Sequence, residues 1–100
     1  RLTLTLATCA GRYSAAMEHA WLMGQDGALH EARRAGMVSL VEATMAAGSG
    51  RIVLARRIEA KAALAVLLAR ATFGADTTVT RRAGMRAHRL LAACDALLLG

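Results

Sequence analysis

The feature that most constrains this chain is that its 100 residues contain no proline. Proline removes a backbone donor and breaks a helix from within, so its absence leaves room for long, uninterrupted helices. Alanine, the best helix former, supplies 24 residues, and the larger apolar residues number 30, which is enough for one small core. These features predict a single all-α domain that spans residues 1–100.

Glycine-containing turns divide the chain at intervals of about 20 residues, or about 30 Å of helix. The turns lie at residues 24–27, 48–50 and 74–78. Between them, apolar residues recur at spacings of three and four, which is typical of amphipathic helices. The predicted helices cover residues 2–23, 28–47 and 51–73, and the last begins at Val79 or Arg81. Four helices of matched length with short links predict an antiparallel up-down-up-down four-helix bundle.

Each predicted helix has one apolar stripe that we expect to face the core. The first is Leu2, Leu6, Cys9, Tyr13, Met17 and Ala20. The second is Leu29, Ala32, Met37, Leu40, Val41 and Thr44. The third is Leu54, Ile58, Ala62, Ala65, Leu68 and Thr72. The fourth is Ala83, Ala87, Leu90, Leu91, Cys94 and Leu98.

Local signals add detail to this prediction. Gly11, Gly36 and Gly84 lie within predicted helices, where each costs about 1 kcal/mol against alanine. We therefore expect each of these glycines to mark a close approach between helices. Thr78 or Thr80 is the expected cap of the last helix.

The two cysteines are expected to meet. Cys9 lies near the start of the first helix and Cys94 near the end of the last, so the two fall at similar heights in an antiparallel bundle. Both also lie on inward stripes, which predicts a Cys9–Cys94 disulfide that joins the two helices. Such a bond favours an oxidising compartment and hence a periplasmic or secreted protein. The alternative is a pair of buried free thiols, which would suit a cytoplasmic protein.

The formal net charge is +6, and 12 of the 13 basic residues are arginine. The segment Arg-Arg-Ala-Gly-Met occurs twice, at residues 33–37 and 81–85. In the predicted bundle both copies lie at one end, which suggests an anion-binding site. Its residues are Arg33, Arg34, Arg81 and Arg82. The alternative is a chance repeat in a chain rich in alanine and arginine.

Several charged residues have expected partners in the bundle. We expect Glu18 to face Arg33 or Arg34 across the first turn, and Asp95 to lie near Arg57. Exposed pairs of this kind commonly contribute less than about 1 kcal/mol.

Catalytic and cofactor signals are missing from the sequence. There is no CxxC or CxxCH motif, no glycine-rich phosphate loop after a strand, and no serine in a nucleophile motif. The three histidines lie too far along their helices to complete a zinc site with the cysteines. We therefore expect that the chain is not an enzyme and that it needs no metal or cofactor. Its longest uncharged segments are too short to cross a membrane.

The best sequence indication of function is surplus apolar surface, since the third predicted helix is apolar nearly all round from Ala62 to Ala69 and two helix ends are also apolar. Trp21 and Leu22 close the first helix, and Leu97 and Leu99 close the last. Apolar residues all round a helix usually indicate burial against another molecule. We expect an interaction or structural protein that binds a protein partner or a second copy of itself. The alternative is a basic protein that binds nucleic acid or phosphate; only three aromatic residues are available to stack on bases.

Overall fold

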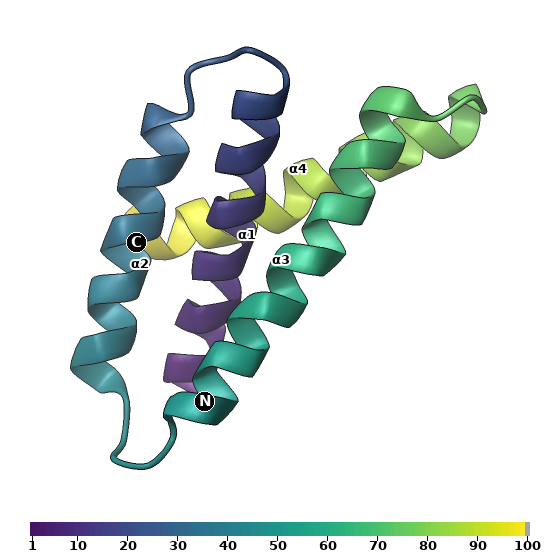
Figure 1. Cartoon of the computed structure of the whole chain (residues 1–100). Coiled ribbons are helices and arrows are strands. Elements are labelled where there is room, and N and C mark those ends of the chain that lie inside the picture. The colour runs from purple at the N-terminus through teal and green to yellow at the C-terminus, as the bar shows by residue number, and fades with distance from the viewer. Residues whose placement is uncertain (100) are drawn as a thin grey trace.

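The computed structural model describes residues 1–99 and places four helices in the predicted order (Figure 1). They are α1 (Leu2–Leu22), α2 (Ala28–Thr44), α3 (Gly50–Phe73) and α4 (Thr77–Leu99). No strand occurs in this part of the chain. The predicted all-α four-helix fold is confirmed, and the predicted boundaries agree with the observed ones to within about four residues. No described helix is long and apolar enough to span a membrane.

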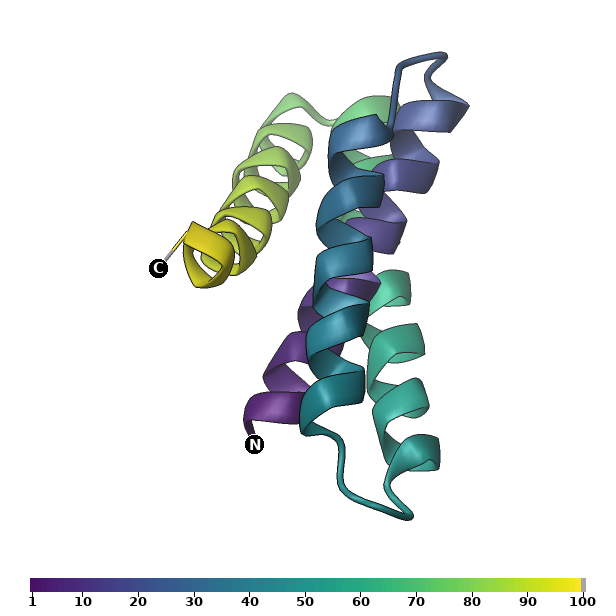
Figure 2. The same cartoon turned by 90° about the vertical axis from the view of Figure 1, so that its left-hand side faces the viewer.

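The four helices do not occupy equivalent positions. The central helix is α1, which packs against both α2 and α3, whereas α2 and α3 do not pack on each other. Helix α4 packs mainly on α3 and reaches α1 over a short length. Figures 1 and 2 show that α4 crosses behind α1 rather than standing beside it as a fourth parallel column. The molecule is accordingly elongated, with extents of 45 × 24 × 23 Å.

The core follows the apolar stripe of α1. Leu6, Cys9, Tyr13, Met17 and Ala20 are all buried as predicted, and only Leu2 of that stripe is exposed. Small residues fill the rest of this helix surface, so neighbouring helices approach it from two sides. The remaining buried core consists mainly of residues from the other three helices: Met37, Val41, Val53, Leu64, Ala83, Ala87 and Cys94.

The predicted disulfide is present. Cys9 and Cys94 are bonded, their Cα atoms are 5.5 Å apart, and both side chains are buried. The bond joins residues 85 positions apart in the chain. Because α4 has few other contacts with α1, the disulfide is the main connection between these two helices.

Gly11 lies at the crossing of α1 and α3, where the helices meet backbone to backbone. A Cβ atom on Gly11 would overlap the carbonyl oxygen of Arg57 and lie 3.0 Å from the backbone nitrogen of Lys61. The expected role of this glycine is confirmed. The same expectation is wrong for Gly36, which has open space around it, and for Gly84, where a Cβ would make an ordinary contact at 3.7 Å.

Helix α4 begins at Thr77 because Asp76 caps it. One carboxylate oxygen of Asp76 accepts hydrogen bonds from the backbone N–H groups of Thr78 and Val79, at 2.9 and 3.1 Å. The expectation of a threonine cap is therefore wrong. A carboxylate satisfies the free N–H groups and also complements the positive end of the helix dipole.

Candidate functional site

One face of α3 is apolar and exposed, and it borders pockets that α3 forms with α1 and α2. It is formed by leucine, isoleucine, valine, phenylalanine and alanine side chains spaced three and four residues apart, all of them exposed: Leu54, Ile58, Ala62, Ala65, Val66, Ala69 and Phe73. We call these seven residues the α3 outer face. Charged residues border this face: at about 100° of rotation per residue, Lys61 lies about 20° from Leu54 and Glu59 about 20° from Val66.

The α3 outer face contains most of the stripe that the sequence assigned to the core. Ile58 is 60% exposed and Leu54 is 53% exposed, whereas the buried residues of α3 are Val53 and Leu64. The expectation for α3 is therefore wrong, because this helix has two apolar faces and only one of them packs on α1 and α4. A second apolar face that the fold leaves largely exposed is an unusual property for a helix of this kind.

The α3 outer face continues onto the end of α1. A pocket of about 310 Å³ lies between the two helices, and Leu22, Ala65, Ala69 and Phe73 contribute to its wall. Leu22 is 70% exposed and Phe73 is 64% exposed, and polar side chains complete the wall: Glu18, His19 and Lys61. One of the predicted interaction residues, Leu22, thus adjoins the outer face.

The other predicted interaction residues do not belong to this surface. Trp21 is exposed, and its indole lies against the turn at Gly27. Leu97 is exposed on α4 beside a different pocket, whose wall also includes Thr5. The side chain of Leu99 lies outside the described residues. The ends of α1 and α4 therefore form separate surfaces.

The four arginines of the repeated segment do not gather. Arg33 pairs with Asp95 at 3.0 Å, near the C-terminal end of α4. Arg81 and Arg82 are exposed in the first turns of the same helix. Thirteen residues separate Arg82 from Asp95, which is about 20 Å of helix. The expected common end for both copies is wrong, because α4 crosses the bundle instead of running parallel to α2.

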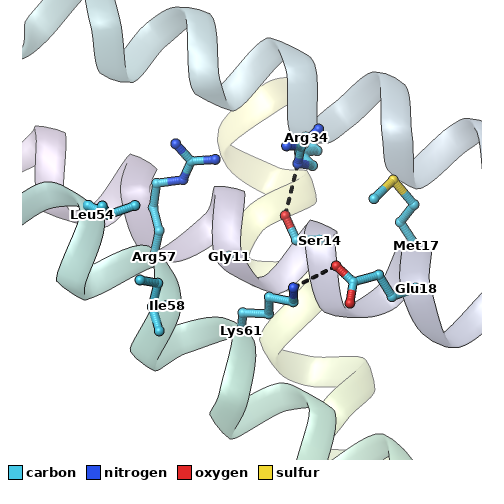
Figure 3. Close-up of a pocket in the computed structure, with 9 residues that line it drawn as sticks. All are labelled: Gly11, Ser14, Met17, Glu18, Arg34, Leu54, Arg57, Ile58 and Lys61. Carbon is cyan, nitrogen blue, oxygen red and sulfur yellow. Dashed lines mark hydrogen bonds and ion pairs between the residues drawn. The ribbon is translucent and has the colours of Figure 1, made fainter.

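Arg34 lines a pocket of about 200 Å³ between α1, α2 and α3, together with Leu54 and Ile58 at one edge of the α3 outer face (Figure 3). Its Nε donates to the hydroxyl of Ser14 at 2.9 Å. The guanidinium of Arg57 reaches from α3 into the same space, and Lys61 pairs with Glu18 at 2.6 Å. Glu18 therefore pairs with a residue of α3 and not with Arg33 or Arg34 as expected.

Asp95 connects three helices through its carboxylate. It accepts a hydrogen bond from the hydroxyl of Tyr13 at 2.6 Å and another from Nη1 of Arg33 at 3.0 Å. Its partner is thus Arg33 of α2, and the expectation that it would lie near Arg57 is wrong. Burial raises the pKa of the Tyr13 hydroxyl, and the hydrogen bond to Asp95 raises it further, because both disfavour the phenolate. The role of this cluster is to hold α4 against α1 and α2.

In the described part of the chain, no three histidine, cysteine, aspartate or glutamate side chains come close enough together to hold a metal ion. Both cysteines are in the disulfide. His19 lies within 3.1 Å of the hydroxyl of Thr72, at the edge of the α1–α3 contact.

Comparison with known proteins gives no relative: no family model, curated protein or solved structure matches this chain. Any assignment of function therefore depends on the surfaces described above.

Proposed function

We propose that this chain is a small, non-enzymatic interaction protein that acts outside the cytoplasm and binds a partner protein through the α3 outer face. The supporting observation is that α3 has a second apolar face, continuous with Leu22, that no part of the described chain covers. Burying such a surface against a partner would contribute roughly 25 cal/mol for each Å² of apolar area removed from water, from which the entropy costs of association are subtracted.

The proposed compartment follows from the disulfide. Disulfides persist in oxidising compartments and are rare in reducing ones. The bond also adds stability that the small core does not provide, because α4 has few contacts with α1. A protein that depends on such a bond is best suited to the periplasm or to the outside of the cell.

Charge indicates the kind of partner. Helix α3 has five basic residues and one acidic residue, and the whole chain has a net charge of +6. Two copies meeting through α3 would bring like charges together, which opposes self-association. We therefore propose as the partner an acidic amphipathic helix of another protein, with apolar residues that pack on the α3 outer face and carboxylates that meet its basic flanks.

Two valines provide a matched test of this proposal. Val66 lies on the α3 outer face and Val79 lies in the first turn of α4, and each is 49% exposed. Partners would be captured from an extract of the native cells on immobilised wild-type protein, purified, and recombined with each variant. We expect Val66→Glu to weaken binding of the recombined partner at least tenfold, and Val79→Glu to leave it within about twofold, since burying a charge at an apolar contact costs more than 1.4 kcal/mol.

The outcomes separate the alternatives. A purified acidic partner that forms a stoichiometric complex with the wild type and not with Val66→Glu supports the proposal. Equal binding by both variants would place the contact elsewhere. Concentration-dependent dimerisation of the isolated chain in sedimentation velocity, lost in Val66→Glu, would identify a second copy as the partner and contradict the proposed acidic helix.

A further inference from the structure

We propose that Arg12, Arg56 and Arg86 form a binding site for a small phosphate monoester with an apolar substituent. The three arginines come from α1, α3 and α4 and line one pocket of about 310 Å³. None of them belongs to the repeated segment, and the site lies apart from the α3 outer face. The inference is therefore independent of the function proposed above.

The crossing of the helices places the three side chains together. Arg12 follows Gly11, where α1 meets the backbone of α3 next to Arg56. Nη1 of Arg12 donates to the carbonyl oxygen of Leu90 on α4, at 3.1 Å. Arg86 lies four residues before Leu90, one turn along the same face of α4.

The charge in this pocket is not balanced. Its only acidic residue is Glu59, which leaves a net charge of +2 from three arginines. Among the described residues the ion pairs are Arg33–Asp95 and Lys61–Glu18, so none of the three arginines has a carboxylate within 4.0 Å. Burial lowers the pKa of Arg12, and the charge of the nearby Arg86 lowers it further. A dianion would relieve this repulsion, and a phosphate monoester carries about −1.5 to −2 at neutral pH.

Arg12 is held in position before any ligand arrives. Besides the carbonyl of Leu90, its Nη1 contacts Sγ of Cys94 at 3.5 Å. The disulfide fixes Cys94 to α1, which sets the distance between Arg12 and the residues of α4. A guanidinium has five N–H donors, so those on its other nitrogens remain for a phosphate oxygen.

The rest of the pocket wall is mainly apolar, which indicates that the organic group of the phosphate monoester is apolar too. Alanine and leucine side chains form much of its wall: Ala60, Ala63, Leu64 and Leu90. A second pocket of about 500 Å³ shares Thr8, Arg12 and Arg56 with the first and extends towards Leu97. No aromatic side chain lines either pocket, so bases of a nucleic acid would find no stacking partner there.

Titration of the folded, oxidised protein by NMR tests this site at constant ionic strength, with hexyl phosphate, inorganic phosphate and hexanoate as separate probes. We expect saturable binding of hexyl phosphate, with shifts of the side-chain N–H signals of Arg12, Arg56 and Arg86. Inorganic phosphate and hexanoate should bind more weakly. Arg56→Gln and Arg86→Gln should each reduce the affinity about tenfold or more, since a charge-assisted hydrogen bond is lost. Arg81→Gln removes the same charge from the first turns of α4, where Arg81 lines a different pocket, and should have little effect.

The proposal would be overturned by the absence of saturable binding, or by an equal loss of affinity in Arg81→Gln, which would show general charge attraction. Tighter binding of hexanoate than of hexyl phosphate would also contradict it and indicate a carboxylate site. Displacement of hexyl phosphate by a short single-stranded oligonucleotide at lower concentration would identify a polyanion surface instead.

Discussion

Gly11 is the residue on which the contact between α1 and α3 depends, because a side chain there would meet the backbone of α3. We expect Gly11→Ala to lower the free energy of unfolding by about 1–3 kcal/mol, since overpacking forces the helices apart. Gly36 is the matched control: it lies within α2 with nothing near its missing Cβ. Gly36→Ala should stabilise the protein by roughly 0.5–1 kcal/mol. Urea denaturation measures both, and changes of the same sign would contradict the close approach at Gly11.

Tyr13 makes the free energy of unfolding depend on pH in the alkaline range. The folded state raises its pKa above the ordinary value of 10.0. Above that pH the unfolded chain loses the phenolic proton while the folded protein retains it, so the free energy of unfolding falls as pH rises beyond about 10. Below pH 10 the hydroxyl is protonated in both states, and its contribution to the free energy of unfolding is fully present.

The variant Tyr13→Phe should show a shallower decline at alkaline pH than the wild type. At neutral pH it should be less stable by about 1–3 kcal/mol, since a hydrogen bond to a charged acceptor is lost. Tyr13 is the only tyrosine, so near-ultraviolet absorbance follows its ionisation directly. Titration near the ordinary value in the folded protein would show that the buried contact with Asp95 is not formed.

At the scale of elements, the disulfide determines how firmly α4 is held. The bond closes a loop of 85 residues, for which the chain-entropy model gives about 4–5 kcal/mol. We expect the Cys9→Ala, Cys94→Ala double variant to lose about this much stability and to show faster hydrogen exchange in the C-terminal half of α4. The mass of the unfolded protein after alkylation provides the direct check. Modification of both cysteines without reductant would refute the bond and remove the argument for export.

The two faces of α3 should respond differently to substitution. Val66→Glu, on the α3 outer face, should change the free energy of unfolding by no more than about 0.5 kcal/mol, as for other exposed positions. Leu64→Ala, on the packed face, should cost about 2–5 kcal/mol because Leu64 is 1% exposed. A large loss of stability in Val66→Glu would mean that the outer face is covered within the folded chain.

Sequence periodicity correctly predicted the buried stripe of α1 and the Cys9–Cys94 disulfide, because the sequence of α1 shows one apolar stripe at helical spacing. It failed for α3, where Leu54 and Ile58 form one apolar row and Val53 and Leu64 form another. Spacing alone cannot decide which row faces the core. The same limit explains why the partner of Asp95 was predicted wrongly, since that partner depends on the crossing angle of α4 rather than on residue spacing.

The all-round apolarity of residues 62–69 indicated a binding surface on α3, whereas the arginine sites were harder to predict from the sequence. The repeated arginine segment was a visible pattern, yet the structure separates its two copies. The pocket of Arg12, Arg56 and Arg86 joins residues from three helices with no shared motif. The only local signal near it was Gly11, since a glycine that permits a helix crossing also fixes which side chains flank that crossing.

At the scale of the whole molecule, the arrangement leaves much of each outer helix without a neighbour. Helix α1 is central, and α2 and α3 flank it without packing on each other. The resulting shape is elongated, and sixteen large apolar residues are exposed among those described. Several of them lie on the α3 outer face, which explains why we assign binding to that face rather than to the helix ends.

Site-specific photo-crosslinking in the native cells shows directly whether the α3 outer face binds a partner. A photoreactive amino acid would be placed at position 66 in one variant and at position 79 in another, since both valines are 49% exposed. We expect one discrete crosslinked product from position 66, containing a second, acidic protein, and none from position 79. No product from position 66, or the same products from both positions, would contradict it.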